Sequence, residues 1–174
     1  MAVQREQLLA QLGDIFRQYG FEGASLARIG AATGMGKGSL YHSFPGGKDE
    51  MAEAVLAHID AWFERAVFAP LRSGAAGPMF DAVDAYFQSG QKVCLVGVFA
   101  LGGERDRFGP AVKTYFVAWI DALEACLART GRADARALAE EVVEAIQGAL
   151  VLARALDDPA LFGRTLARLR ARCL

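Results

Sequence analysis

Residues 25–48 read SLARIGAATGMGKGSLYHSFPGGK, and they carry the clearest local structure in the chain. Ser25 is a good helix N-cap, and Leu26 and Ile29 then fall three residues apart on one face. Gly34 stands where a glycine in the left-handed conformation would end the helix. The pattern predicts a short helix that begins after Ser25 and ends at Gly34.

A second short helix is predicted over residues 37–43. Leu40 and Phe44 lie four residues apart and can share its buried side. Two short helices joined by a glycine-containing turn form a helix-turn-helix unit. The exposed side of the second helix then mixes a cation, hydroxyl groups and a phenol, which suit DNA phosphates and base edges.

The same region excludes carboxylates. No Asp or Glu stands between Gly23 and Lys48, whereas Arg28, Lys37 and Lys48 add three positive charges. A surface that lies against DNA needs such a charge pattern. The whole chain has a formal net charge of −1, and its first fifty residues hold five basic and five acidic side chains. We therefore expect DNA binding to depend on a local patch that is present in two copies.

The run from Ile29 to Lys48, with GKGSLYHSF at its centre, resembles the DNA-binding signature of the TetR family of bacterial transcriptional regulators. The resemblance covers about the first quarter of the chain. Gly36 stands where the family usually caps the recognition helix with serine, and Gly30 replaces a common alanine. The link Pro45–Lys48 is about one residue longer than usual, a variant associated with one multidrug-responsive branch of the family.

The resemblance implies two groups of DNA contacts. The residues implied to contact phosphates are Ser25, Ser39, Tyr41 and Lys48. The residues implied to face the major groove are Arg28, Lys37, Gly38 and His42. The alternative is that any small helical protein can hold a helix-glycine-helix corner, in which Tyr41 or His42 is simply a surface residue.

The rest of the chain predicts an all-α protein with about nine helices. The expected helices span residues 3–19, 26–33, 37–43, 48–69, 79–89, 93–101, 110–129, 134–156 and 159–172, with Pro70 ending the fourth. Residues 93–101 could also form a buried strand, but no second strand exists to pair with it. We expect a helix-turn-helix DNA-binding domain over residues 1–47 and a ligand-binding and dimerisation domain over residues 48–174.

Hydrophobic residues make up 53% of the 174-residue chain, an excess that indicates apolar surface buried in a partner subunit or around a cavity. The apolar faces of the last two expected helices, over residues 134–156 and 159–172, must be buried against other apolar surface. They pack either on their own domain alone or in a four-helix bundle with a second copy, and the TetR resemblance favours the second. The expected interface residues are Leu138, Val142, Ile146, Ala149, Leu150, Ala153 and Leu166.

The second domain has the composition of a receptor for a small apolar or aromatic molecule. The expected ligand-binding residues are His58, Trp62, Phe87, Cys94, Phe99, Tyr115, Phe116 and Trp119. For each of these residues a filled core is nearly as good an interpretation. His58 is more often a hydrogen-bonded core histidine than a ligand contact.

The sequence argues against catalysis. His42 and His58 are the only histidines, and neither stands in a nucleophile or metal motif. The three cysteines are Cys94, Cys126 and Cys173, a number and spacing that fit neither a disulfide framework nor a zinc cluster. We expect no enzyme activity, cofactor or metal. The absence of a signal peptide, and apolar runs too short to cross a bilayer, predict a cytoplasmic protein without a membrane contact.

Three functions remain open at this point. The favoured one is a ligand-responsive homodimeric repressor, released from a palindromic operator when a small effector changes the spacing of two recognition helices from about 34–36 Å. The second is a thiol-switched regulator that uses Cys94 or Cys126. The third is a helical small-molecule binding protein with no role on DNA.

Overall fold

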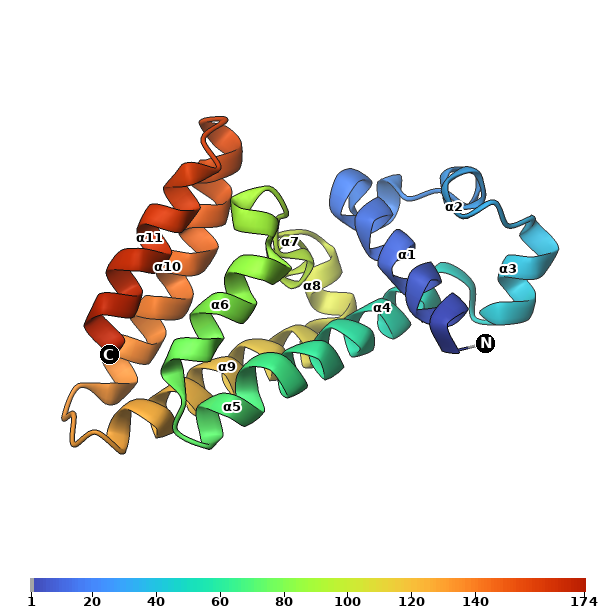
Figure 1. Ribbon diagram of the computed structural model, residues 1–174. Coiled ribbons are helices and arrows are strands. Elements are labelled where there is room, and N and C mark those ends of the chain that lie inside the picture. Colours follow the sequence, from blue (N-terminus) through green and yellow to red (C-terminus); the bar gives the residue numbers. More distant parts are fainter. Residues whose placement is uncertain (1) are drawn as a thin grey trace. The chain divides into compact units, whose positions relative to one another are not determined.

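The computed structural model describes residues 2–174, with side chains from Gln4 onward, and this part of the chain contains helices and no strands. Figure 1 labels the elements along the ribbon. They are α1 (Ala2–Gly23), α2 (Leu26–Thr33), α3 (Lys37–Ser43), α4 (Gly47–Phe63), a π-helical turn η1 (Glu64–Phe68), α5 (Ala69–Arg72), α6 (Ala76–Tyr86), a 3-10 turn η2 (Gln88–Gly90), α7 (Leu95–Leu101), α8 (Glu104–Arg107), α9 (Gly109–Ala128), α10 (Ala135–Ala155) and α11 (Ala160–Cys173). The predicted all-α fold is confirmed.

The chain forms two compact units, and each contains two separate stretches of sequence. The N-terminal unit joins the residues up to Ala61 with Leu95–Val112, and the C-terminal unit joins Trp62–Cys94 with Lys113–Leu174. These are packing units, and they do not coincide with the functional domains expected over residues 1–47 and 48–174. That functional division stays a prediction.

The helix-turn-helix of the N-terminal unit follows its local signals. The Ser25 hydroxyl accepts a hydrogen bond from the Arg28 backbone N–H at 3.3 Å and so caps α2. Gly34 ends α2 with φ at 69°. Gly36 begins α3 without a side-chain cap, as the missing serine predicted. Both predicted helices are confirmed at the predicted residues.

A cluster of four phenylalanines forms part of the core of the N-terminal unit. The ring of Phe21 lies 6.0 Å from that of Phe16 and 5.3 Å from that of Phe108, centroid to centroid. The ring of Phe99 lies 6.1 Å from Phe16 and 5.3 Å from Phe108. All four side chains are buried, so a segment of α7 and α8 packs with α1 although it lies about eighty residues away in sequence.

Two predicted helix ends are corrected. The first predicted helix ends before Gly20, and the structure has a break there, with Gly20 at φ 67°, before one more turn to Gly23. Pro70 does not end the fourth helix. A π-helical turn precedes it, and Pro70 then lies in the first turn of α5, where its missing N–H needs no partner. The helical path ends at Arg72, whose carbonyl accepts a hydrogen bond from Arg129 Nη2 at 2.8 Å.

In the C-terminal unit, α6 begins earlier and ends earlier than predicted. Three successive residues, Gln88, Ser89 and Gly90, have positive φ values of 50°, 51° and 90°, so the helix cannot continue to Ser89. Gly90 is required twice. Its φ lies in the left-handed region, which residues with a side chain rarely adopt. In addition, a Cβ on residue 90 would lie 2.6 Å from the Cβ of Phe162 on α11. The close approach of Phe162 on α11 therefore requires glycine in this turn. The periodicity of the sequence does not reveal it.

Phe63 lies at the centre of an aromatic core in the C-terminal unit. Its ring centroid lies 4.9 Å from those of Tyr86 and Tyr115 and 5.3 Å from that of Trp119. The Trp119 indole N–H donates to the Met79 sulfur at 3.5 Å. Phe63, Tyr115 and Trp119 are buried, so the core of this unit is built mainly from aromatic rings that contact one another.

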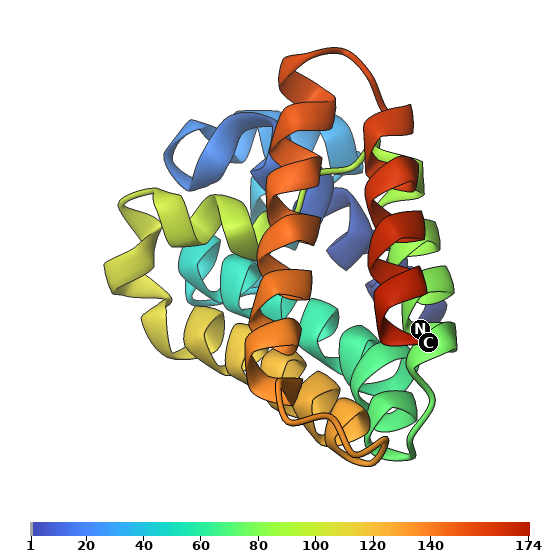
Figure 2. The ribbon, with the colours of Figure 1, turned by 90° about the vertical axis from the view of Figure 1, so that its left-hand side faces the viewer.

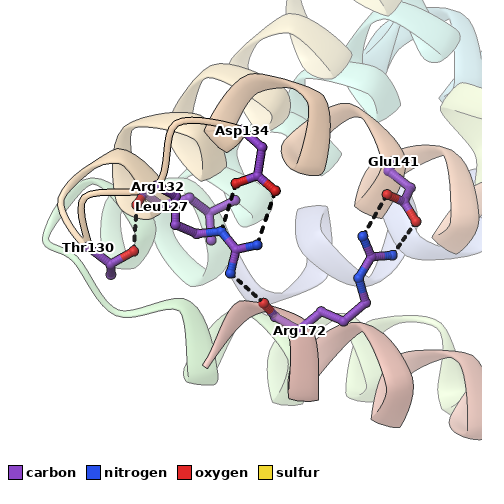
Figure 3. A network of polar contacts seen from close by, with 6 residues as sticks. All are labelled: Leu127, Thr130, Arg132, Asp134, Glu141 and Arg172. Atoms are coloured by element: carbon purple, nitrogen blue, oxygen red, sulfur yellow. Dashed lines mark hydrogen bonds and ion pairs between the residues drawn. The ribbon is translucent and has the colours of Figure 1, made fainter.

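The helices α10 and α11 run antiparallel and side by side, and polar contacts join their ends (Figures 2 and 3). Arg132 bonds Asp134 at 3.0 Å and donates to the Arg172 carbonyl at 3.0 Å. Arg172 forms a two-bond ion pair with Glu141. The Arg172 guanidinium lowers the pKa of Glu141, and Arg132 lowers the pKa of Asp134 in the same way. The end of α11 is therefore tied to the start of α10.

Replacing Gly90 by alanine should destabilise the protein by about 2 kcal/mol or more, because strain in the left-handed region adds to overpacking against Phe162. Gly131→Ala is the matched control. Gly131 also has a positive φ, of 80°, but a Cβ there meets nothing within 4 Å. Urea unfolding should show a clearly smaller loss for the control. Equal losses would contradict the close-contact argument.

The Glu141–Arg172 pair, whose side chains are 50% and 48% exposed, should make a small contribution to stability that depends on pH. Because the folded pKa of Glu141 is lowered, its contribution is present above the ordinary pKa of 4.5 and is lost as the pH falls through the folded pKa. Arg172→Met should therefore lower the unfolding free energy near neutral pH, and its difference from the wild type should shrink below about pH 4.5. Arg168→Met, on the same helix but bonded to the uncharged Thr165 hydroxyl, should show no such trend. A difference that stays constant down to pH 3 would refute the assignment.

Candidate nucleic-acid interface

The helix α3 has one buried side and one exposed side, as predicted. Leu40 is 1% exposed and Phe44 is fully buried. The exposed residues of α3 include Lys37, Gly38, Ser39, Tyr41 and His42, which are the five α3 residues implied as DNA contacts. The structure therefore brings these five together on one accessible surface, which we name the α3 face.

The turn after α3 fixes the position of Tyr41. The Lys37 ammonium lies 5.9 Å from the centroid of the Tyr41 ring. Gly47 lies close to the same ring, since a Cβ on Gly47 would come within 3.6 Å of Tyr41 Cε1. Gly47 has φ at 70°, and its N–H donates to the Phe44 carbonyl at 2.9 Å. The Gly46 N–H donates to the Glu50 carboxylate at 2.7 Å. The long glycine-rich link is thus an ordered turn that leads directly into α4.

Arg28 lies at the junction of α1 and α2. Its Nη1 donates to the Gly23 carbonyl at 2.6 Å, and its guanidinium lies 4.5 Å from the centroid of the Tyr19 ring. The side chain is exposed but already bonded within the chain. A major-groove contact by Arg28 stays a prediction, and the arrangement equally suits a residue that fixes α2 on the end of α1.

Lys48 is the most enclosed of the residues implied to contact DNA. Its side chain is 23% exposed. Its ammonium donates to the Phe21 carbonyl at 2.9 Å and lies 4.3 Å from the centroid of the Phe21 ring. The Glu22 carboxylate is 3.7 Å away. Without DNA, Lys48 is thus bonded to the end of α1.

One residue near Lys48, Arg107, was not predicted from the sequence. Arg107, the last residue of α8, lies with its guanidinium 4.9 Å from the centroid of the Phe21 ring and bonds Asp49 at 2.9 Å. No sequence signal predicted α8, because Gly102 and Gly103 indicated only the end of a helix. The proximity of Arg107 depends on tertiary packing.

An open groove of about 1110 Å³ lies next to the helix-turn-helix. The residues that line it are Gln4, Arg5, Gln7, Leu8, Ala10, Gln11, Thr33, Met35 and Ser43. The Arg5 guanidinium lies 5.4 Å from the centroid of the Phe44 ring, at the end of α3. The groove offers amides, hydroxyls and one cation, which are neutral or positive groups suited to phosphate oxygens.

The residues predicted to bind a ligand fall into both units. His58 and Phe99 lie in the N-terminal unit, where Phe99 belongs to the phenylalanine cluster. The predicted residues in the C-terminal unit are Trp62, Phe87, Cys94, Tyr115, Phe116 and Trp119. Phe87, Tyr115 and Trp119 contact Phe63, which was not among the predicted ligand-binding residues. The ligand contacts stay predictions.

The cysteines are free thiols in buried positions. Burial raises the pKa of the Cys126 thiol and that of the Cys173 thiol. A raised pKa lowers the fraction of reactive thiolate at neutral pH. Among the residues that the structure describes, no group of His, Cys, Asp and Glu side chains is arranged to hold a metal ion. No helix in residues 2–174 is both long and apolar enough to cross a lipid bilayer.

The seven residues expected at a dimer interface lie inside the chain. Leu138, Val142, Ile146, Ala149, Leu150, Ala153 and Leu166 are each 6% exposed or less. Their strongly apolar stripe packs against their own domain. The other side of α10 is open, with Val151, Leu152 and Leu156 49–63% exposed. Any interface built on α10 and α11 therefore uses the outward side that faces the viewer in Figure 2.

Two stretches of the chain match known families. Residues 8–55 match the family described as bacterial regulatory proteins, tetR family. Residues 79–167, just over half of the 174 residues, match the family described as transcriptional regulator LmrA/YxaF-like, C-terminal domain.

Individual proteins give the same result. The chain is 44% identical over 52 residues to the HTH-type transcriptional regulator LmrA of Bacillus subtilis (strain 168), a match that covers 29% of this chain and only 28% of that protein. A TetR transcriptional regulator from Legionella pneumophila has the same fold, with a TM-score of 0.79 at 22% identity over 98% of this chain and 97% of that one.

A cysteine mutant of the TetR family transcriptional regulator CifR, complexed with a 26 bp double-strand operator DNA, is 25% identical, with a TM-score of 0.70 over 96% of each chain. Sequence motif, fold and family matches therefore agree. The chain belongs to the tetR family of bacterial regulatory proteins and carries a C-terminal region of the LmrA/YxaF-like type.

Proposed function

We propose that the protein is a ligand-responsive, DNA-binding transcriptional regulator that acts as a homodimeric repressor. The observation that carries the proposal is the α3 face, where a cation, a hydroxyl, a phenol and an imidazole are exposed on one helix. No carboxylate interrupts the sequence from Gly23 to Lys48. Such groups bind phosphates and read base edges in the major groove.

The DNA partner in this proposal is a palindromic operator. The complex of CifR with a 26 bp operator supports it, because that regulator shares the fold over nearly the whole chain. Two copies related by a twofold axis would present two α3 helices about 34–36 Å apart, one turn of B-DNA. A role on operator DNA would place the protein in the bacterial cytoplasm.

The homodimer would form through the outward side of α10 and α11. On α10 this side carries Gly148, Val151, Leu152 and Ala155. On α11 the exposed small residues are Gly163, Ala167 and Ala171, of which Gly163 and Ala167 line a shallow groove with α6. Small residues let helices approach closely, and exposed Val and Leu supply apolar area, so two such helix pairs can form a four-helix bundle. This side replaces the buried stripe as the proposed interface.

The effector would be a small apolar or aromatic molecule that binds in the C-terminal unit. The aromatic core around Phe63 supplies apolar and aromatic groups, and Tyr115, whose ring centroid lies 4.9 Å from that of Phe63, adds a hydroxyl. The π-helical turn η1 within this core is a kind of local irregularity often found at functional sites. The effector would lower operator affinity because it binds one of two dimer states more tightly than the other. Such a coupling is typically about 1–3 kcal/mol.

The alternatives are less well supported. A thiol switch needs a reactive thiolate, and burial of the three cysteines works against one. A carrier protein without a DNA role leaves the exposed α3 face unexplained. Enzyme activity is not typical of the family, and we propose none.

The salt dependence of operator binding tests the proposal. Wild-type protein should bind DNA that flanks its own gene, with an affinity that falls as salt rises. Lys37→Met should weaken binding and reduce the slope of log affinity against log salt by about one, because one phosphate or groove contact by a cation is lost. The measurement is fluorescence anisotropy with labelled DNA.

Lys113→Met, which removes an equal charge from an exposed position on α9, is the control and should leave the slope unchanged. Failure of the wild type to bind at low salt would exclude the repressor. An unchanged slope in the Lys37 variant would exclude the α3 face as the contact surface.

A further inference from the structure

The Phe21 side chain is shared by two cations from distant parts of the chain. Its ring centroid lies 4.3 Å from the Lys48 ammonium and 4.9 Å from the Arg107 guanidinium. Phe21 is 1% exposed, held in the phenylalanine cluster against Phe99 and Phe108. It is therefore a fixed surface on which both cations are placed.

Arg107 also contacts the start of α4. Its Nη1 bonds the Asp49 carboxylate at 2.9 Å, and Asp49 directly follows Lys48. The two side chains of this pair are 51% and 55% exposed, so the pair contributes little to folding stability. We therefore expect the pair to affect where the two side chains lie rather than how stable the fold is.

Arg107 thus contacts two neighbours of Lys48, namely Phe21 and Asp49. Lys48 donates to the carbonyl of Phe21, and the ring of the same Phe21 meets Arg107. Asp49, the next residue along the chain, is bonded to Arg107. Arg107 also offsets the charge of Asp49, the first carboxylate after the stretch that is free of them. All of these residues belong to the N-terminal unit.

We infer that Arg107 is a positioning residue for operator binding, which fixes where Lys48 lies beside α3. The inference rests on the proposed function, because Lys48 is the cation that would meet a DNA phosphate. Arg107 lies in the stretch that matches the C-terminal family, whereas Phe21, Lys48 and Asp49 lie in the stretch that matches the N-terminal one. One side chain of the C-terminal stretch thus orders the phosphate contact of the other.

Arginine is suited to this role in a way that lysine is not. A planar guanidinium can stack on an aromatic face and at the same time donate to a carboxylate at its edge. An ammonium is a point charge on a flexible stem, so Arg107→Lys should restore operator binding only in part.

The test is a double-variant cycle on operator affinity. Arg107→Met and Lys48→Met should each weaken binding, the first by roughly three- to tenfold. The double variant should bind no more weakly than Lys48→Met alone, and its salt slope should fall by about one relative to the wild type. Additive losses with a slope reduced by about two would show that Arg107 itself contacts a phosphate, and this would overturn the positioning role.

The matched control is Arg105→Met, which removes the same charge from an exposed residue of the same four-residue helix. It should leave affinity and slope close to those of the wild type. If it reproduces the Arg107 effect, long-range charge explains the result and the inference is overturned. Thermal unfolding of each variant, with midpoints close to the wild type, separates positioning from loss of fold.

A second readout needs no DNA. Acetylation of lysines by a water-soluble N-hydroxysuccinimide ester, followed by mass spectrometry, reports how freely each ammonium moves. Lys48 should react more slowly than the exposed Lys37 in the wild type, and Arg107→Met should accelerate Lys48 alone, whereas Arg105→Met should not. An unchanged rate at Lys48 overturns the inference. A wild type that does not bind operator overturns the proposed function together with the operator role, while a wild type that binds with an additive cycle overturns the inference alone.

Discussion

Four phenylalanine rings join α1 to the segment from α7 to Phe108 in the core of the N-terminal unit, and the placement of Lys48 and Arg107 depends on this cluster. Phe16 and Phe21 lie on α1 and Phe99 lies on α7, while Phe108 directly follows α8. Because the rings are buried against one another, the helices that carry the α3 face have a support from the middle of the chain. The same contact places Phe21 where Lys48 and Arg107 can use it. A change in the 95–112 segment can therefore act, through Phe21 and Asp49, on the position of Lys48, which is implied to contact DNA.

The helix-turn-helix could be predicted to the residue because its signals are local. Ser25 caps α2, Gly34 ends it, and Leu40 with Phe44 marks the buried side of α3, and each of these works within one or two turns of chain. The features that were missed depend on distant contacts. Gly90 has a positive φ at the point where Phe162 of α11 lies within contact distance. The helix α8 contacts α1 and α4 through Arg107. Pro70 predicts a helix end, but it lies in the first turn of α5, directly after the π-helical turn η1.

The candidate site divides in the same way. Exposure of Lys37, Tyr41 and His42 follows from helical periodicity and was predicted. The partners of Arg28 and Lys48 are backbone carbonyls of Gly23 and Phe21, and no sequence pattern reveals a carbonyl that points at a cation. The outward side of α10 was missed because the strongest apolar stripe of a helix packs into its own core. The outward side that we propose as the interface, with Gly148 and Ala155, is less hydrophobic and is recognised only once the core is known.

The central claim is that a segment from the second half of the chain holds the DNA-reading helices in place. Native-state hydrogen exchange of Phe99→Ala tests it most directly, since this change removes one ring of the cluster, and truncating a buried phenylalanine typically costs about 3–5 kcal/mol. The account predicts that amides of α1, α2 and α3 lose protection, although Phe99 lies far from them in sequence, while amides of α10 and α11 keep theirs. Unchanged protection in α1–α3 would contradict the claim.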